Sequence, residues 1–306
     1  MAVATLKTAV IIASKGRSET LRELIPFLNA QTEAPTQLIL AVTAREDADF
    51  DLASLLAPQI PGKVIYGPPG SSKQRNAGLD HLRDDIDLVV FYDDDFLPSR
   101  FALENIAAAF AQNPDVSGMS GHLLADGIHS QGVSFFEAKA MIEAWDEEHN
   151  PQENKSDVTI SDYVGLYGCN MAVRRSAIAD LRFDERLPAY GWLEDLDFGV
   201  RLPGRTVMTN AFSGVHLGTR RGRETNGELL GYSQIVNPYY LYHKGSISLA
   251  HALIRVFKNS SANAVKSLRP EPWIDRSARL RGNLIGVGDV LSGKADPGRI
   301  EHWQTS

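Results

Sequence analysis

Three consecutive aspartates, Asp93, Asp94 and Asp95, directly follow the apolar run 88–92. If a buried strand ends here, it brings three carboxylates to one point, where they repel one another and lose hydration. A divalent cation would remove this conflict, because it neutralises carboxylates and takes oxygen atoms as ligands. Side chains alternate along an extended chain, so Asp93 and Asp95 should point the same way. The spacing predicts a metal site, with a solvated acidic turn or a helix cap as the alternative.

The first third of the chain alternates β-rich apolar runs with helical patterns, which predicts parallel βαβ units covered on both faces. Ligands of such sheets bind beyond the carboxyl ends of the strands, and polar clusters follow three of these ends. The clusters are 14–17, 43–47 and 93–95. The expected strands are 8–13, 37–42, 63–66 and 87–92, with helices from Ser18 and over 52–56, 73–82 and 100–112. We interpret residues 1–115 as a nucleotide-binding half. The loop 67–70 has neither the P-loop spacing nor the GxGxxG spacing, and its sequence therefore disfavours an ATPase or a dehydrogenase.

The rest of the chain is less regular. The polar segment 125–160 is interpreted as an insertion or lid beside the site. The expected strands are 116–124, 163–173, 206–211 and 214–217, and the expected helices are 174–179, 193–201 and 246 to about 268. The loop 218–228 contains Arg220, Arg221 and Arg223. This basic loop could fold over a diphosphate, meet an anionic partner such as lipid head groups, or simply be solvated.

Composition limits the classes of protein. The chain has 306 residues, enough for one large domain or one domain with an appendage. Its net charge of -7 argues against general nucleic-acid binding. The single cysteine, Cys169, excludes an internal disulfide and fits a reducing compartment; we expect it to be a buried apolar residue in a strand. Because no apolar run approaches the roughly 20 residues of a membrane span, we expect a cytoplasmic protein, with peripheral contact at the inner face of a membrane left open.

Several segments, in the right order, resemble glycosyltransferase family two. A strand ending in SKGR and then KQRNAG at 73–78 resembles the family's RNxG segment, and VVFYDDDFLPS resembles its DxD segment. GCNMAVRRSAI, followed by FDERLPAYGWLEDLDFGVRL, resembles its GxN, FDE and ED segment. The likeness covers about residues 7–217. The tail sequences NPYYLYHKG and RGNLIG look like the tails of bacterial polysaccharide-building members.

This resemblance implies a GT-A fold, which is an α/β nucleotide-diphospho-sugar transferase fold with a mixed sheet and helices on both faces. It also implies a nucleoside-diphosphate sugar donor, a divalent metal (Mn²⁺ or Mg²⁺) and inversion at the anomeric carbon. We expect a GT-A domain over 1–235, composed of a nucleotide-binding half (1–115) and an acceptor and catalytic half (116–235). A small, mainly helical C-terminal extension would cover 236–306.

The resemblance assigns the metal and the diphosphate chiefly to Asp95, supported by Asp93. His216 follows at the spacing of a further ligand in some members, and a hydrogen-bonded structural histidine is the alternative. Asp94 would point away, toward the ribose or the sugar. Ser14, Arg17, Arg75, Asn76 and Thr43 are expected to bind the nucleotide. Thr43, Glu46 or Asp47 would replace the aspartate that reads the base in many members, and a solvated helix surface is the alternative for Arg75.

Glycosyl transfer also needs a base that takes a proton from the acceptor hydroxyl. The resemblance places this role on the adjacent acidic pair, and we choose Asp195, with Glu194 as the alternate or as an acceptor ligand. The alternative is that both carboxylates cap a helix. Trp192 could stack on a sugar ring or pack in the core.

The sequence therefore predicts a metal-dependent, inverting hexosyltransferase. Its acceptor would be a saccharide, with a lipid-linked saccharide included; no nucleic-acid partner is expected, and the oligomeric state is left open. A sugar-phosphate nucleotidyltransferase is one rival, although ASKGRSETL is a poor match to the Gly-rich signature of that class. A non-catalytic scaffold that binds nucleotide-sugars is the other.

Overall fold

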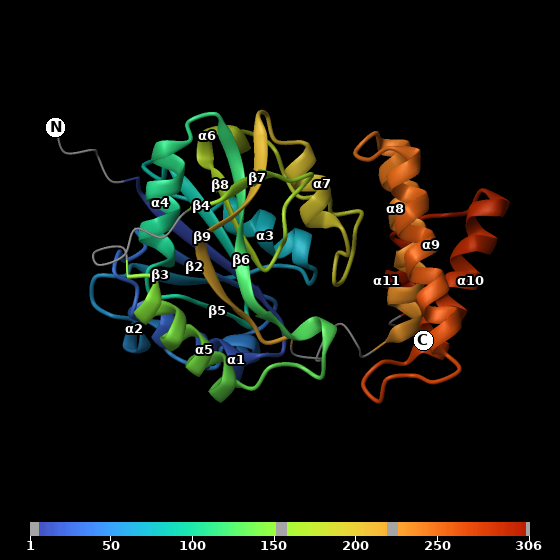
Figure 1. Cartoon of the computed structure of the whole chain (residues 1–306), viewed down its shortest axis with the longest axis horizontal. Coiled ribbons are helices and arrows are strands. Elements are labelled where there is room, and N and C mark those ends of the chain that lie inside the picture. Colours follow the sequence, from blue (N-terminus) through green and yellow to red (C-terminus); the bar gives the residue numbers. More distant parts are fainter. Residues whose placement is uncertain (1–5, 151–157, 219–225, 304–306) are drawn as a thin grey trace. The chain divides into compact units, whose positions relative to one another are not determined.

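The computed structural model describes residues 6–150, 158–218 and 226–303, which form two compact units (Figure 1). The first unit comprises Met1–Pro69, Lys73–Phe183 and Phe198–Thr219, and the second comprises Gly70–Ser72, Asp184–Asp197 and Arg220–Ser306. Each unit is described by itself below. The expected domain division at 235/236 falls inside one continuous helix, α8 (Gly227–Lys244), and it stays a prediction.

The first unit begins with parallel strands built from the apolar runs of the sequence. These strands are β1 (Thr8–Ser14), β2 (Gln37–Val42), β3 (Gly62–Tyr66) and β4 (Leu88–Asp93), in the sheet order β3-β2-β1-β4. Every residue of β2 is buried, as expected for a parallel strand covered on both faces. Alternate residues of β1 enter two hydrophobic clusters: Val10 and Ile12 face one, and Ala9 and Ile11 face the other.

Helices cover both faces of this part of the sheet. Helices α1 (Ser18–Asn29) and α4 (Ala102–Gln112) contribute Leu21, Leu24 and Phe110 to one cluster. Helix α3 (Ser71–Leu79) contributes Leu79 to the other cluster. The shorter helical elements near these strands are η1 (Arg45–Ala48) and α2 (Leu52–Leu55). The expected βαβ pattern is thus confirmed.

Beyond β4 the sheet becomes mixed. The strands β8 (Asn170–Arg174), β6 (Val116–Asp126), β9 (Arg205–His216) and β5 (Phe96–Pro98) continue it in that order, and β7 (Ile160–Asp162) pairs with β9. Because β8 is antiparallel to both β4 and β6, and β6 is parallel to β9, the carboxyl ends of β4, β6 and β9 lie along one edge. The short strand β5 pairs Phe96 with His216.

Several expected elements differ from the structure. Part of the expected insertion is the helix α5 (Phe135–Glu148), which begins at the capping box of Ser134 and Glu137 and buries Ala138 and Ile142 in the core. The expected strand 163–173 is interrupted, so Cys169 lies in a turn just before β8, although it is buried as expected. The two strands expected at 206–217 form one strand, β9, whose pairing with β6 contains irregularities where the polar positions interrupt the pattern. The basic residues Arg220, Arg221 and Arg223 lie outside the described residues.

The second unit consists mainly of helices: α8, α9 (Leu249–Lys266), α10 (Arg276–Ser292) and α11 (Arg299–Trp303) (Figure 1). Helix α8 contains Gly227, Gly231 and Pro238, which are poor helix formers, and this explains why the sequence pattern predicted a helix only from residue 246. Its stability comes from packing, because Tyr232, Ile235 and Val236 form a buried cluster with Ile300. Helix α7 (Glu194–Val200) begins in this unit, whereas α6 (Arg175–Ile178) and the 3₁₀ turn η2 (Gly127–His129) belong to the first unit. No helix among the described residues is long and apolar enough to cross a membrane.

Close approach of α8 and α10 depends on glycine. A Cβ added at Gly282 would collide with the backbone carbonyl oxygen of Glu228, and one added at Gly231 would collide with that of Arg279. Gly288, in the same helix α10, has open space around it.

We expect Gly282→Ala to lower the free energy of unfolding by about 1–3 kcal/mol, because α8 and α10 must move apart. The matched control is Gly288→Ala, which should raise this free energy by about 0.5–1 kcal/mol through helix propensity alone. Urea unfolding followed by far-ultraviolet circular dichroism compares the two. Equal stability of both variants would show that the α8–α10 contact tolerates a side chain at this position.

Candidate functional site

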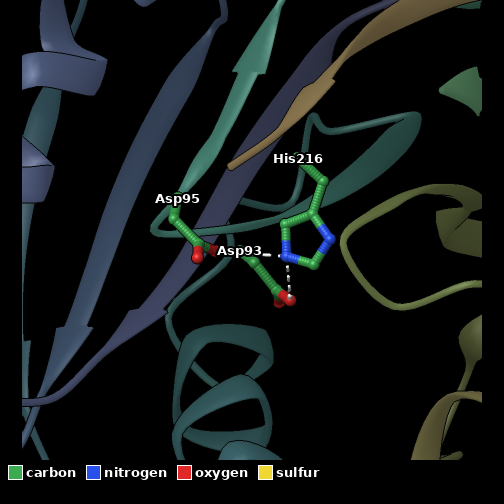
Figure 2. A group of neighbouring side chains, drawn as sticks. All are labelled: Asp93, Asp95 and His216. Carbon is green, nitrogen blue, oxygen red and sulfur yellow. Dashed lines mark ion pairs between the residues drawn. The ribbon is translucent and has the colours of Figure 1, made fainter. Parts of the chain in front are cut away.

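Three side chains that could ligate a metal meet at the edge of the sheet where β4, β6 and β9 end (Figure 2). Asp93 is the last residue of β4, Asp95 lies between β4 and β5, and His216 is the last residue of β9. One ligand atom from each lies within 4.8 Å of the others. The His216 Nε2 atom is 3.3 Å from Asp95 Oδ1 and 3.9 Å from Asp93 Oδ2. We refer to these residues as the DDH cluster.

The donor set of the DDH cluster fits a divalent cation. Two carboxylates supply hard oxygen ligands, and the imidazole supplies a nitrogen ligand of the kind that transition metals accept. Asp95 and His216 are buried, whereas the Asp93 side chain is 29% exposed, so the cluster is open on one side. A cation held there would keep positions for oxygen atoms of a bound molecule.

His216 is oriented by a residue that sequence reasoning missed. Its Nδ1 atom lies 2.9 Å from Asp126 Oδ1, at the end of β6, and the Tyr167 hydroxyl donates to the other Asp126 oxygen at 2.6 Å. A carboxylate behind a metal-binding histidine fixes the ring and makes its second nitrogen a better ligand. Asp126 could have been suspected, because it ends a strand that runs parallel to β4.

Protons and cations would compete for His216. Burial opposes its charged form, but hydrogen bonds to the Asp126 and Asp95 carboxylates favour that form, and the pKa of His216 lies well above the usual value. Burial raises the pKa of the Cys169 thiol to about 11. Cys169 is therefore a protonated, buried thiol at neutral pH and not a nucleophile.

Asp94 points to a different partner from its two neighbours. Its carboxylate accepts a hydrogen bond from the Ser14 hydroxyl at 2.6 Å and pairs with Arg17 Nη1 at 2.6 Å. Burial raises the pKa of Asp94 to about 6, although Arg17 opposes this shift. Arg17 also lies 3.6 Å from Asp95, and the aspartates raise the pKa of Arg17 although its own burial opposes this. Asp94, Ser14 and Arg17 thus form one buried group behind the DDH cluster.

Arg75 belongs to the same edge of the sheet. It is buried, its Nη2 atom donates to Asp93 Oδ1 at 2.8 Å and to the Gly168 carbonyl at 3.2 Å, and it lies over the Phe183 ring. The alternative of a solvated helix surface is therefore wrong for Arg75. Its neighbour Asn76 exchanges two hydrogen bonds with the backbone of Phe183, which fixes α3 in place.

The loop after β2 is organised by Asp47. The Thr43 hydroxyl donates to this carboxylate at 2.6 Å, and the backbone amides of Gly16, Thr43 and Ala44 also donate to it. Although burial opposes the shift, these hydrogen bonds lower the pKa of Asp47. Asp47 therefore ties the loop after β1 to the loop after β2.

The acidic pair lies in the second unit, at the start of α7. Glu194 is buried and accepts a hydrogen bond from the Ser71 hydroxyl at 3.1 Å, whereas Asp195 is half-buried. The preceding residue, Leu193, has a φ of 77°, a conformation that costs a side chain other than glycine about 1–3 kcal/mol. Trp192 is half-buried, and its carbonyl accepts from Asn237 of α8. The strained backbone at Leu193 sets the orientation of the first residues of α7.

Lys244, which sequence reasoning missed, forms ion pairs with two carboxylates, one of them on α7. Its ammonium group lies 2.8 Å from Asp197 and 2.6 Å from Asp184. Asp197 is fully buried and also accepts from the Ser246 hydroxyl at 2.6 Å. Because the sequence gives no periodic signal for a contact between residues 197 and 244, only the folded structure shows this arrangement.

Comparison with known proteins identifies the class. Residues 9–182 match the family model described as glycosyl transferase family 2, so the chain belongs to that family. Its mixed sheet with helices on both faces is the GT-A fold, with C-terminal helices added. None of the curated proteins matches the chain.

Solved structures share this fold at low sequence identity. S. aureus TarS residues 1–349 superpose with a TM-score of 0.56 at 16% identity, covering 97% of this chain and 83% of that one. A longer S. aureus TarS structure gives a TM-score of 0.51 at 14% identity and covers 87% of this chain, which spans only 46% of that TarS chain. The mannosyltransferase PcManGT from Pyrobaculum calidifontis, in complex with GDP-Man and Mn²⁺, gives a TM-score of 0.53 at 13% identity, covering 95% and 83% of the two chains.

We expect Asp126→Asn to weaken Mn²⁺ binding to the full chain by about 10–100-fold, because the His216 ring loses the charge that orients it. Isothermal titration calorimetry measures the affinity. The matched control is Asp115→Asn, an exposed carboxylate that pairs with Arg205 and should leave Mn²⁺ affinity unchanged. An unchanged affinity in Asp126→Asn would mean that Asp126 does not support the DDH cluster.

We expect Arg17→Met to lower the free energy of unfolding by about 3–5 kcal/mol, because it leaves the buried Asp94 carboxylate without its cation. Arg22→Met is the control, since Arg22 and Asp49 form an exposed ion pair that solvent screens, so its loss should change stability little. Urea unfolding of both variants gives the difference. A loss in Arg17→Met no larger than in Arg22→Met would show that the Arg17–Asp94 pair does not stabilise the fold.

Proposed function

We propose that this protein is a metal-dependent, inverting glycosyltransferase that moves a hexosyl group from a nucleoside-diphosphate sugar to a saccharide. The observation that carries the proposal is the DDH cluster at the carboxyl edge of a family 2 sheet. Resemblance to glycosyltransferase family two implies a nucleotide-sugar donor, and ligands of such sheets bind beyond the carboxyl ends of the strands. The GDP-Man and Mn²⁺ in PcManGT make these two molecules the first to test on this chain.

The residues of the DDH cluster would hold the cation, and the cation would supply positive charge to the β-phosphate of the leaving nucleoside diphosphate. Asp95 and His216 would be the buried ligands, with Asp93 on the open side. Mn²⁺ suits this set better than Mg²⁺, because Mg²⁺ prefers an all-oxygen shell.

Two arginines give the same edge of the sheet positive charge. Arg75 lies behind Asp93 and Arg17 lies behind Asp94 and Asp95, so each carboxylate is partly neutralised before a ligand binds. This lowers the repulsion between the aspartates and an incoming diphosphate. Ser14, Asn76 and Thr43 shape the adjacent loops through their hydrogen bonds, and we propose that these loops form the nucleotide site.

Asp195 is the base in this proposal. A half-buried carboxylate can accept a proton from an acceptor hydroxyl while remaining reachable, whereas Glu194 is buried and hydrogen-bonded to Ser71. Glu194 would then orient the acceptor or Asp195 itself, and Trp192 would offer a ring face to a sugar. The acceptor that we propose is a growing saccharide, and a lipid-linked saccharide is included in the test.

We expect Asp195→Asn to keep donor affinity and to lower the transfer rate by at least about 100-fold, because the base is lost. Asp95→Asn should instead weaken Mn²⁺-dependent donor binding. A panel of nucleotide-sugars that includes GDP-Man, assayed with Mn²⁺ and with a chelator, measures binding, hydrolysis and transfer. Asp115→Asn serves as the control for both substitutions.

Four outcomes would contradict parts of this proposal. Absence of binding to every nucleotide-sugar, with or without Mn²⁺, would exclude the transferase. Binding without hydrolysis or transfer to any saccharide would indicate a non-catalytic scaffold. Normal turnover by Asp195→Asn would move the base to another residue, and loss of donor binding in that variant together with normal transfer by Asp95→Asn would reverse the two roles.

A further inference from the structure

Helix α9 turns a polar side toward its own unit. Asn263 is fully buried; its amide donates to Gln234 of α8 at 2.8 Å and to Asn283 of α10 at 2.9 Å. Arg276 of α10 donates to the Asn263 carbonyl oxygen at 3.0 Å, and Asn259 of α9 accepts from Gln234. Hydrogen bonds between side chains therefore fix α9 to α8 and α10, beside the apolar contact of Val256 with the Tyr232 cluster.

The opposite side of α9 is apolar and exposed. We call this surface the α9 face, and its side chains are between 50% and 84% exposed. It consists of Leu249, Leu253, Ile254, Phe257, Val265 and Leu268. Leu249, Leu253 and Phe257 are four residues apart, so they form one row along the helix. Isolated apolar side chains are common on protein surfaces, but a group of large ones along a single helix is typical of a surface that binds a partner.

Helix α10 repeats this arrangement. Its outward positions Leu284, Val287 and Leu291 are exposed, whereas the positions that face α8 are Gly282 and Gly286. Gly282 and Gly286 thus allow α10 to pack closely on α8, beside the apolar cluster of Tyr232, Ile235 and Val236. Leu284, Val287 and Leu291 point outward, where a helix of a water-soluble protein normally carries polar residues.

The charges around the α9 face select the kind of partner. The stretch 229–270 contains no aspartate or glutamate. Of its five cations, Lys244 pairs with Asp184 and Asp197 and Lys266 pairs with Glu271, which leaves Arg255, Lys258 and Arg269 to define the charge near the α9 face. Lys258 is exposed beside Phe257, and Arg269 is exposed beside Leu268. A second copy docked through the same face would bring like charges together, which is unfavourable. A partner surface with negative charge above an apolar layer would complement both the apolar side chains of the α9 face and the cations beside them.

We propose that the α9 face binds the surface of a bilayer that contains anionic phospholipids. The helix would lie in the plane of the interface, with its leucines and Phe257 among the acyl chains and its cations at the lipid phosphates. This mode of binding needs no membrane-spanning helix, and no described helix could span. The proposal does not rest on the transferase chemistry, because no residue of the DDH cluster or of the acidic pair takes part.

Vesicle co-sedimentation of the full chain tests this binding. The vesicles contain either equal parts of phosphatidylcholine and phosphatidylglycerol, or phosphatidylcholine alone. We expect binding to the anionic vesicles that weakens at high salt, and about tenfold or more weaker binding to the neutral vesicles. The double variant Leu253→Gln, Phe257→Gln should lower binding to the anionic vesicles by about tenfold or more, because two apolar side chains that would enter the acyl layer are lost.

The matched control is Phe136→Gln, which removes an aromatic side chain that is 82% exposed on α5, a helix of the first unit. It should bind the vesicles like the unaltered chain. The same transfer and nucleotide-binding assays on the double variant show whether the protein is still folded. Because the substituted side chains are exposed, we expect these assays to be unchanged.

Three results would overturn the proposal: no binding to the anionic vesicles, equal binding to both kinds of vesicle, or equal losses in the double variant and in Phe136→Gln. Sedimentation equilibrium without vesicles tests the alternative that a second copy of this chain covers the α9 face. Self-association that the double variant abolishes, without vesicle binding by the unaltered chain, would identify the α9 face as a contact between copies of this protein.

Discussion

Three adjacent carboxylates are compatible with this fold because basic side chains from three separate elements surround them. Asp93 pairs with Arg75, Asp94 pairs with Arg17, and Asp95 lies beside His216. The partners come from α3, from the loop after β1 and from the end of β9. Any strand order that separated these elements would leave buried charge without compensation, which is among the most destabilising changes in a protein interior. The arrangement of the first unit is therefore closely tied to the electrostatics of this one segment.

The strand order accomplishes this pairing in two steps. The parallel strands β1 and β4 are neighbours, which places the loop with Arg17 next to Asp94. The antiparallel insertion of β8 then returns the sheet to the original direction at β6 and β9, so that Asp126 and His216 arrive at the same edge. Because the two reversals at β8 cancel, β6 and β9 run in the same direction as β4, and His216 ends at the same edge of the sheet as the aspartates.

Sequence reasoning recovered the first half of the fold nearly to the residue, because the strands there are continuous apolar runs between short loops. It identified Asp93, Asp95 and His216 as a possible metal set, and the structure brings these three together. It missed Asp126 and Lys244, because their roles depend on contacts across 90 and 47 residues that leave no periodic signal. It also missed the first helix of the extension, since glycines and a proline hide α8 from propensity arguments.

The anchoring of Asp94 has a kinetic and entropic consequence for its neighbours. Its bonds to Ser14 and Arg17 fix the backbone between β4 and β5, so Asp93 and Asp95 are held in position on either side of a clamped residue. Asp126 similarly restricts rotation of the His216 ring. The loss of conformational entropy for these three side chains therefore occurs during folding and not when a cation arrives. A cation should then bind to and leave a rigid DDH cluster. The size and the donor atoms of this cluster would set the selectivity, and the segment between β4 and β5 would not need to rearrange.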